Sequence, residues 1–264
     1  GNKYTLLEQI IPLFPTNINT FYDVFGGSFT VGINVEAKTI VYNDINKYLV
    51  ELIQFLCECN IEETLNNIHN TIKKFNLGKN RYNEYYIFRD YYNKNKHPML
   101  LFILGCHAFN YDIRFNKEGD FNKAYGNRSY NKNIEQRFIE FNKVAKNKNI
   151  KFMNTNFTNI FPENIDDFVY LDPPYLPTVT SYTENGIWGQ DKEKQLYEYI
   201  DYLNSNNIKF ALSNVLVYHG KDNEMLRKWS KKYNIHILEH SYNNNNHYRK
   251  NNKLKDEEVL ITNY

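Results

Sequence analysis

The chain has 264 residues, of which 42% are hydrophobic and 23% are charged, and its formal net charge is +2. Its length suits one large folded domain or a domain with an inserted lobe, and its apolar content excludes a disordered chain. A net charge this small excludes bulk charge as a source of nucleic-acid affinity, so any such affinity must come from a local basic face.

The cysteines and the lack of long apolar runs indicate the compartment and the class of cofactor. Cys57, Cys59 and Cys106 form an odd set, and no histidines stand at zinc-ligand spacing, so neither disulfides nor a metal site is predicted. No apolar run approaches the roughly twenty residues of a membrane span, and the N-terminus shows no signal-peptide pattern. We therefore expect an intracellular, cytoplasmic protein without metal or membrane contact.

The first part of the chain has the order of a nucleotide-binding βαβ unit. Apolar spacing predicts, in order, a helix over 4–14, a strand over 20–25, a helix from the glycines to about 36, a strand over 39–42 and a helix over 45–57. The second strand ends in an acid. A strand, a glycine turn, a helix and a strand that ends in an acid are typical of sheets that bind nucleotides.

The middle of the chain shows no clear strand pattern. Residues 61–96 have a helical, polar and tyrosine-rich pattern, and residues 98–108 predict an apolar helix. Residues 109–125 carry repeated aromatics and charges, which predicts a β-hairpin or a long ordered loop. Because this stretch interrupts the alternation of strands and helices, we assign residues 58–132 to an inserted lobe.

The alternation resumes after residue 132. The sequence predicts helices over 133–146, 191–203 and 221–232, and strands over 150–153, 168–171, 208–212, 235–238 and 259–262. Strands separated by helices predict an α/β fold with a Rossmann-like, doubly wound and mainly parallel sheet. Residues 1–57 and 133–264 would form this sheet domain, with the helical and hairpin lobe inserted between them.

Asp172-Pro173-Pro174-Tyr175 directly follows the strand expected over 168–171, at the end where open α/β sheets bind ligands. The two prolines fix φ at about −65° and lack backbone donors, so their carbonyls are rigid acceptors beside the flat tyrosine. Such a set suits a planar substrate with an exocyclic amine, held by two acceptors and stacked on the aromatic ring. A proline-stiffened turn without a ligand is the alternative.

A second candidate site consists of Phe25-Gly26-Gly27 and Asp44. Glycines let the backbone approach a ligand closely, and nucleotide-binding sheets hold ribose hydroxyls with an acid at the end of the second strand. A dinucleotide fingerprint needs G-x-G-x-x-G, so a cofactor with adenosine and no phosphates, such as S-adenosylmethionine, fits better. A tight turn at the glycines and a helix N-cap at Asp44 are the alternatives.

With these motifs in this order, the chain resembles the Dam-like, alpha-group DNA adenine-N6 methyltransferases. Other stretches resemble the family's N-terminal G-x-K (Gly1-Asn2-Lys3), its R-x-N-x-x-G-x-F-N hairpin (114–122), its D-F pair beside the cofactor's adenine (Asn156-Phe157) and its last strand (258–264). The chain departs from the family at Phe29, in place of the last glycine of F-x-G-x-G, and at Asn156, in place of aspartate.

The resemblance implies methyl transfer from S-adenosylmethionine to N6 of adenine in duplex DNA, with the base flipped into a pocket formed by Asp172, Pro173, Pro174 and Tyr175. Asp172 and the carbonyl of Pro173 would accept hydrogen bonds from the amine, and Tyr175 would stack on the base. The cofactor contacts that the resemblance implies are Lys3, Phe25, Gly26, Gly27, Asp44, Phe157 and Asp172.

The resemblance also implies that the lobe over 58–132 reads the target sequence, chiefly through Arg114, Phe115, Asn116 and Lys117. Arg128, Arg249 and Lys250 are candidate phosphate contacts, with solvated surface charge as the alternative. Double-stranded DNA is the expected partner. The enzyme would accompany a separate restriction endonuclease, or act as an orphan or phage methylase.

Two other functions are compatible with the same residues. An adenine in RNA or a glutamine amide in a protein is also a planar amine, although the inserted hairpin favours duplex DNA. A catalytically silent module that binds DNA or cofactor belongs to another class of function, and the intact motif from Asp172 to Tyr175 argues against it.

Overall fold

The structure, a computed structural model, describes residues 3–176, 188–239 and 256–264. The chain divides into two compact units: the sheet unit, Gly1–Asn46 with Asn149–Tyr264, and the helical unit, Lys47–Lys148. The helical unit begins before and ends after the range 58–132 that the sequence assigns to the inserted lobe. Among the described residues, no helix combines the length and the apolar character needed to cross a membrane.

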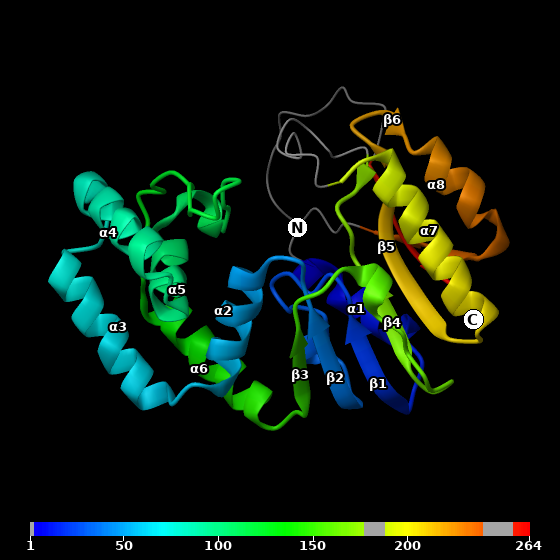
Figure 1. The fold of residues 1–264 in the computed structure, drawn as a ribbon, viewed down its shortest axis with the longest axis horizontal. Coiled ribbons are helices and arrows are strands. Elements are labelled where there is room, and N and C mark those ends of the chain that lie inside the picture. Colours follow the sequence, from blue (N-terminus) through cyan, green and yellow to red (C-terminus); the bar gives the residue numbers. More distant parts are fainter. Residues whose placement is uncertain (1–2, 177–187, 240–255) are drawn as a thin grey trace. The chain divides into compact units, whose positions relative to one another are not determined.

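In its described part, the sheet unit contains one eight-stranded sheet with the order β3-β2-β1-β4-β5-β8-β7, and β6 pairs with β5 (Figure 1). The strands are β1 (Ile18–Asp23), β2 (Ala37–Asn43), β3 (Ile150–Met153), β4 (Phe168–Leu171), β5 (Lys209–Tyr218), β6 (Lys221–Asp222), β7 (Asn234–Leu238) and β8 (Glu257–Thr262). Neighbours from β3 to β5 are parallel, and β8 is antiparallel to both β5 and β7. The predicted Rossmann-like, mainly parallel α/β fold is therefore confirmed.

The direction in which the strands are added reverses between β1 and β4. From β1 the chain builds outward through β2 and β3 on one side, and from β4 it builds through β5 on the other. Open α/β sheets bind ligands outside the carboxyl ends of the strands at such a switch point. Between the parallel neighbours β2 and β3, the whole helical unit stands in place of the crossover that parallel strands require.

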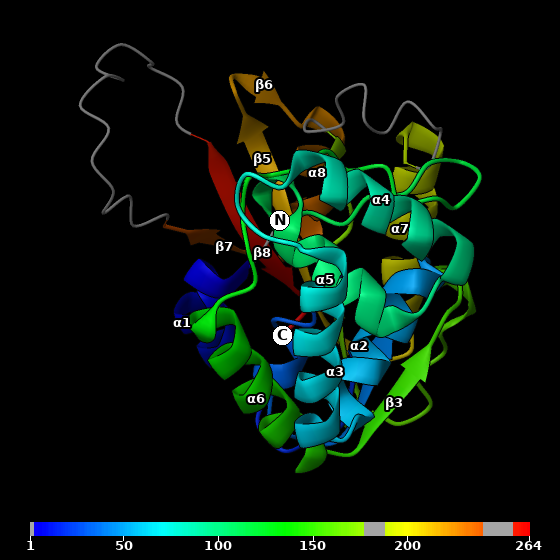
Figure 2. The ribbon, with the colours of Figure 1, turned by 90° about the vertical axis from the view of Figure 1, so that its left-hand side faces the viewer.

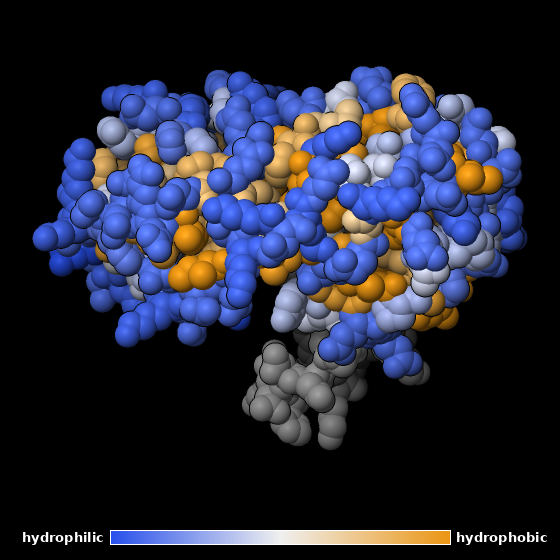
Figure 3. All heavy atoms as spheres, turned by 90° about the horizontal axis from the view of Figure 1, so that it is seen from below, coloured by the Kyte–Doolittle hydropathy of each residue, from blue (hydrophilic) through white to orange (hydrophobic). Residues whose placement is uncertain are grey.

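The core of the sheet unit lies on both faces of the central strands. Val169 of β4 belongs to the apolar cluster that α7 (Gln190–Ser205) covers. Phe168, the preceding residue, points to the opposite face, where its ring centroid lies 4.9 Å from that of Phe14. On the outside, hydrophilic residues cover most of the face drawn in Figure 3, with hydrophobic patches between them. Burial on both faces explains why β4 is apolar throughout.

The helix predicted from the glycine turn to residue 36 is wrong. The chain turns back on itself there and keeps only a 3₁₀ turn at Gly32–Asn34. Phe29 takes a φ of 61° and is fully buried, a backbone conformation that no α-helix contains. The amide of Gly32 donates to Asp23 Oδ2 at 3.1 Å instead of to a helical carbonyl.

Two other predicted helices are shorter than expected. The segment over 4–14 consists of 3₁₀ turns at Lys3–Leu6 and Ile11–Leu13 around α1 (Leu7–Ile10), because Pro12 has no backbone donor to continue the helix. The segment over 221–232 begins with β6, continues as α8 (Glu224–Trp229) and ends in a 3₁₀ turn at Ser230–Lys232.

The helical unit packs around α5 (Figure 2). Its helices are α2 (Lys47–Glu58), α3 (Ile61–Phe75), α4 (Tyr82–Asn95), α5 (Pro98–His107) and α6 (Lys132–Lys146). Most residues of α5 are buried, as expected of a helix that is apolar on every side. Residues 109–125, which we call the hairpin loop, contain the isolated bridge Phe115↔Phe121, and a second isolated bridge joins Tyr125 to Ala108 just before the loop. The second of the two predicted alternatives, a long ordered loop, describes this segment.

Candidate active site

A cavity of about 510 Å³ lies at the carboxyl ends of the strands around the switch point. Its walls are the segments that follow β1, β2, β3 and β4, together with Lys3, Trp188 and Lys192. All seven residues expected to bind the cofactor and all four of the motif at Asp172 line it. The structure thus brings the two predicted sites into one cavity, whose volume is typical of small-molecule sites.

The turn after β1 is shaped by its two glycines. A Cβ atom on Gly26 would lie 2.3 Å from a ring carbon of Tyr42, so a larger residue would collide with β2. Gly27 takes a φ of 50°; its amide donates to Asp44 Oδ2 (3.1 Å), and its carbonyl accepts from the Tyr42 hydroxyl (2.8 Å). These contacts hold the backbone of the turn against the cavity.

Asn43, the last residue of β2, connects three loops of the cavity. Its Nδ2 donates to the carbonyls of Val24 (2.9 Å) and Thr155 (3.1 Å), and its Oδ1 accepts from the amide of Thr155 (3.0 Å). Its own carbonyl accepts from the amide of Gly26 (2.8 Å). Because Asn43 is only 2% exposed, water does not compete for these bonds, and the loops after β1, β2 and β3 keep one geometry.

Three aromatic rings form an apolar wall of the cavity. The ring centroid of Phe25 lies 5.5 Å from that of Phe157 and 5.6 Å from that of Trp188. Glu193 of α7, which is fully buried, accepts a hydrogen bond of 2.8 Å from Trp188 Nε1 and so fixes the indole. A wall of this kind suits the flat face of a purine.

Two acids beside the turn, Asp23 and Asp44, line the cavity, and burial raises the pKa of both. Burial raises the pKa of Asp23 to about 7, against the lowering effect of the hydrogen bond from Gly32. Burial also raises the pKa of Asp44, although the amides of Asn46 and Gly27 lower it. Asp44 Oδ1 accepts from the amide of Asn46 at 2.8 Å, so Asp44 caps the segment before α2 and lines the cavity at once.

The carboxylate of Asp172 belongs to an ionic cluster. Nζ of Lys3 lies 3.0 Å from Asp172 Oδ1 and 3.0 Å from Oε1 of Glu258 in β8. The hydroxyl of Tyr175 donates to Asp172 Oδ1 at 2.9 Å and lies 3.2 Å from Glu258 Oε1. Burial on its own lowers the pKa of Lys3, but the two carboxylates outweigh it and the pKa is raised. Lys3 is therefore charged at neutral pH.

The cluster positions Tyr175 beside Asp172. Nζ of Lys3 also contacts the Tyr175 hydroxyl and lies 4.8 Å from the centroid of its ring. Burial, Asp172 and Glu258 raise the pKa of Tyr175 far above its ordinary value, so the hydroxyl keeps its proton. One lysine faces two carboxylates. Pro173 is buried, whereas Pro174 is exposed.

Arg114 and Phe115 of the hairpin loop are both engaged within the helical unit. Nε of Arg114 donates to Asn122 Oδ1 at 3.0 Å, across the two arms of the loop. The ring of Phe115 stacks on that of Tyr48 in α2, with centroids 4.9 Å apart. Phe115 therefore packs inside the unit, and Arg114 helps to hold the two arms of the loop together.

The other predicted DNA contacts in and near the hairpin loop have different surroundings. Asn116 Oδ1 accepts from the amide of Asp120 at 2.7 Å and so closes the turn at the tip. Lys117 is exposed. The guanidinium of Arg128 lies 4.3 Å from the centroid of the Tyr111 ring. Lys117 is thus presented to solvent, and Asn116 has a structural task that the sequence pattern did not indicate.

Several residues at the cavity or its ionic cluster were not among the predicted site residues, and Asp23, Trp188 and Glu258 are three of them. Asp23 had a signal, because it ends the first strand at the same edge as the motif after β4. Trp188 and Glu258 had none, because only the tertiary fold brings them there. Arg249 and Lys250 lie outside the described residues. Within those residues, no group of three or more His, Cys, Asp or Glu is arranged to hold a metal ion.

Comparison with known proteins identifies one family and several relatives. A family model described as D12 class N6 adenine-specific DNA methyltransferase matches residues 1–244. The chain is 41% identical over 272 residues to the type II methyltransferase M.FokI of Planomicrobium okeanokoites, and 39% identical over 275 residues to the modification methylase StsI of Streptococcus sanguinis. Both comparisons cover 100% of this chain and 42% of the relative, so the chain spans less than half of their length. It is also 25% identical over 248 residues to the DNA adenine methylase of Escherichia coli K12, across 90% of this chain and 84% of that protein.

Proposed function

We propose, because this chain belongs to the D12 class N6 adenine-specific DNA methyltransferases, that it transfers a methyl group from S-adenosylmethionine to N6 of adenine at a specific site in duplex DNA. The observation that carries this proposal is the single cavity shared by the glycine turn, Asp44 and the motif that begins at Asp172. Relatives named as a type II methyltransferase and a modification methylase support a further proposal. The enzyme would work in the cytoplasm beside a separate restriction endonuclease.

The charge and the aromatic wall of the cavity support S-adenosylmethionine as the cofactor. This molecule carries positive charge on its sulfur and its amino group, together with a neutral adenosine. Asp23, Asp44 and Asp172 line the cavity, and the Lys3 charge is shared between two carboxylates. We propose that Asp44 accepts the ribose hydroxyls, that Phe25 and Phe157 cover the adenine, and that Asp23 attracts the cationic amino group.

Bound S-adenosylmethionine would supply an electrophilic methyl group to the adenine nitrogen. We propose that Asp172 accepts a hydrogen bond from the N6 amine and stabilises the positive charge that develops there during transfer. A carboxylate offers about four lone-pair sites, and Lys3 and Tyr175 engage only Oδ1 in the contacts described above. The carboxylate of Asp172 at the cavity favours a substrate that becomes cationic.

The proline carbonyl and the tyrosine would complete the grip on the flipped base. We propose that the rigid carbonyl of Pro173 accepts the second N6 hydrogen bond and that the Tyr175 ring stacks on the base. The hydrogen bond from the Tyr175 hydroxyl to Asp172 supports this, because it fixes the ring against the carboxylate. Orientation of this quality is worth up to roughly 7–11 kcal/mol of the barrier when the reacting atoms are in line.

The helical unit contains the residues that we propose for DNA reading. By this proposal the lobe over 58–132 recognises the target sequence, with Arg114 and Lys117 at the hairpin loop, and Arg128 contacts phosphate. Arginine and lysine are the side chains that most often contact base edges and phosphates, and Lys117 is exposed. Arg249 and Lys250 remain proposed phosphate contacts.

Labelled methyl transfer tests the proposed function directly. The purified chain is incubated with S-adenosylmethionine carrying a labelled methyl group and, separately, with duplex DNA, RNA or protein. We expect label in duplex DNA, on N6 of adenine, at one sequence context. Label in RNA or in protein glutamine would favour the alternative substrates, and cofactor binding without label in any substrate would favour a silent module.

A further inference from the structure

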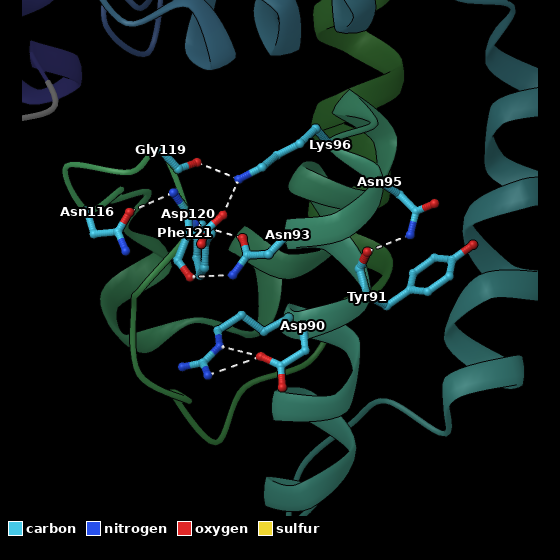
Figure 4. A network of polar contacts seen from close by, with 10 residues as sticks. Asp90, Tyr91, Asn93, Asn95, Lys96, Asn116, Gly119, Asp120 and Phe121 are labelled. Atoms are coloured by element: carbon cyan, nitrogen blue, oxygen red, sulfur yellow. Dashed lines mark hydrogen bonds and ion pairs between the residues drawn. The ribbon is translucent and has the colours of Figure 1, made fainter.

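The hairpin loop is fastened to the end of α4 by two side chains that no motif assigns a role. Nζ of Lys96 contacts the carbonyl of Gly119 and lies 2.8 Å from Asp120 Oδ1 (Figure 4). Asn93, one helical turn earlier, accepts from the amide of Phe121 through Oδ1 (2.8 Å) and donates to its carbonyl through Nδ2 (3.2 Å). Three consecutive residues of the loop are thus held by polar groups of α4.

Tyr48 of α2 supplies the surface on which the fastened loop rests. A Cβ atom on Gly119 would lie 2.9 Å from the Tyr48 hydroxyl, so the loop approaches closely enough to require glycine, which also takes a φ of 80°. Nζ of Lys96 lies 5.1 Å from the centroid of the same ring, and Phe115 stacks on it. The loop tip is therefore held by the ammonium group of Lys96 and packs on the ring of Tyr48.

The backbone at Lys96 indicates what this lysine does. Lys96 follows the last residue of α4 with a φ of 50°, the left-handed conformation that glycine or asparagine adopts most easily at the end of a helix. A lysine there gains nothing from its backbone position, so its contribution comes from the ammonium group. That group neutralises Asp120, whose carboxylate would otherwise repel DNA phosphates.

We propose that Lys96 and Asn93 are positioning residues for DNA recognition, which hold the tip of the hairpin loop so that Arg114 and Lys117 meet the target bases. This inference rests on the proposed function. Lys96 and Asn93 contact loop atoms and need not touch DNA themselves. Their loss would leave the cavity of the sheet unit intact and would loosen the loop.

Hydrogen exchange tests the inference without any need for activity. In Lys96→Met, the amides of Gly119, Asp120 and Phe121 should exchange about 5- to 10-fold faster, the size expected for one lost hydrogen bond of ordinary strength, because solvent weakens this exposed ion pair. Lys94→Met, an exposed lysine on the same helix, is the matched control and should leave these amides unchanged. Equal exchange in wild type and Lys96→Met would overturn the proposal.

Kinetics with a fold-safe variant separate positioning from a merely structural role. Lys96→Gly relieves the left-handed backbone and should keep or raise the thermal stability, yet it removes the ammonium group. We expect its KM for duplex DNA to rise about 5- to 10-fold, with more methylation outside the preferred sequence context, while kcat and the Kd for S-adenosylmethionine stay within about twofold. Lys96→Arg should recover part of the loss.

The outcomes distinguish this inference from the proposed function. If Lys96→Gly has the KM and sequence context of the wild type, the positioning role is wrong although the methyltransferase stands. If the wild type methylates no DNA, the proposed function fails, and faster exchange in Lys96→Met would then leave a loop clamp with no role in DNA recognition, which also contradicts the inference.

Discussion

The cavity of the sheet unit and the hairpin loop of the helical unit are held by contacts of different kinds. At the cavity, the 2% exposed Asn43 connects three loops through hydrogen bonds that water does not reach. At the hairpin loop, the side chains of Lys96 and Asp120 are 26% and 46% exposed. Exposed ion pairs contribute little stability because water and salt compete with them. The cavity is therefore held more firmly than the hairpin loop, and under the proposed function substitutions should alter DNA recognition more readily than methyl transfer.

Of the substitutions proposed, Asp172→Ala should produce the largest effect, and that effect should be on methyl transfer. The variant loses the acceptor for the N6 amine and its negative charge, so turnover should fall by roughly 100-fold or more. Turnover is measured as label transferred to duplex DNA, with the Kd for S-adenosylmethionine from calorimetry as the control for folding. Turnover near that of the wild type would show that Asp172 does not have the proposed role.

Asp23→Asn should stabilise the fold at alkaline pH. Burial raises the pKa of Asp23 from 3.8 to about 7, so its contribution to stability is fully present below pH 3.8 and is lost as the pH rises through about 7. Ionising this buried acid costs about 4 kcal/mol at most. The free energy of unfolding of the variant should exceed that of the wild type by up to this amount at pH 8, and the two should converge at pH 4.

Asp23→Asn also tests the proposed attraction between Asp23 and the cationic amino group of the cofactor. At pH 8 it should bind S-adenosylmethionine more weakly than the wild type, because the cationic amino group loses an opposite charge. A parallel stability curve for both proteins across this pH range, or unchanged cofactor affinity, would contradict the role given to Asp23.

Gly26→Ala should destabilise the sheet unit by about 1–3 kcal/mol, the usual effect of forcing an atom into a packed site. Its Cβ would lie 2.3 Å from the ring of Tyr42, whereas a Cβ on Gly189 meets nothing within 4 Å. Gly189→Ala is therefore the matched control. Thermal denaturation of both variants checks this, and equal melting temperatures would mean that the turn yields more easily than the buried contacts indicate.

Arg128→Ala should have the smallest effect, and that effect should be on DNA binding. If its guanidinium contacts a phosphate, the variant should bind DNA a few fold more weakly, and the slope of log K against log salt should decrease by about one. Arg137→Ala, on the exposed part of α6, serves as control. An unchanged slope would leave Arg128 as a surface charge that packs on Tyr111.

Sequence patterns predicted the sheet and the two motifs that meet at the cavity because the relevant signals are local. Asp172 directly follows β4, and the glycine turn directly follows β1, so parallel neighbours bring them to the same edge without further information. The helix expected up to residue 36 failed for a tertiary reason. Phe29 is buried with a left-handed backbone, and the packing that compensates for this lies outside any local pattern.

The contacts that the sequence could not predict join distant segments through side chains. Lys3 and Glu258 meet at Asp172, and Lys96 meets Gly119 and Asp120. In each case one residue is an ordinary charge in its local pattern, typical of a solvated surface. This residue becomes an interaction partner only in the folded structure.

The position of the helical unit between β2 and β3 has a consequence for how such enzymes diversify. The chain leaves the sheet unit after Asn46 and re-enters it at Asn149, so two splice points enclose every hairpin residue that we assign to DNA contact. If the helical unit reads the target as we propose, exchanging this segment between relatives should change the target preference and leave the cavity of the sheet unit unchanged. A library of such exchanges would be a set of interchangeable recognition units on one sheet unit.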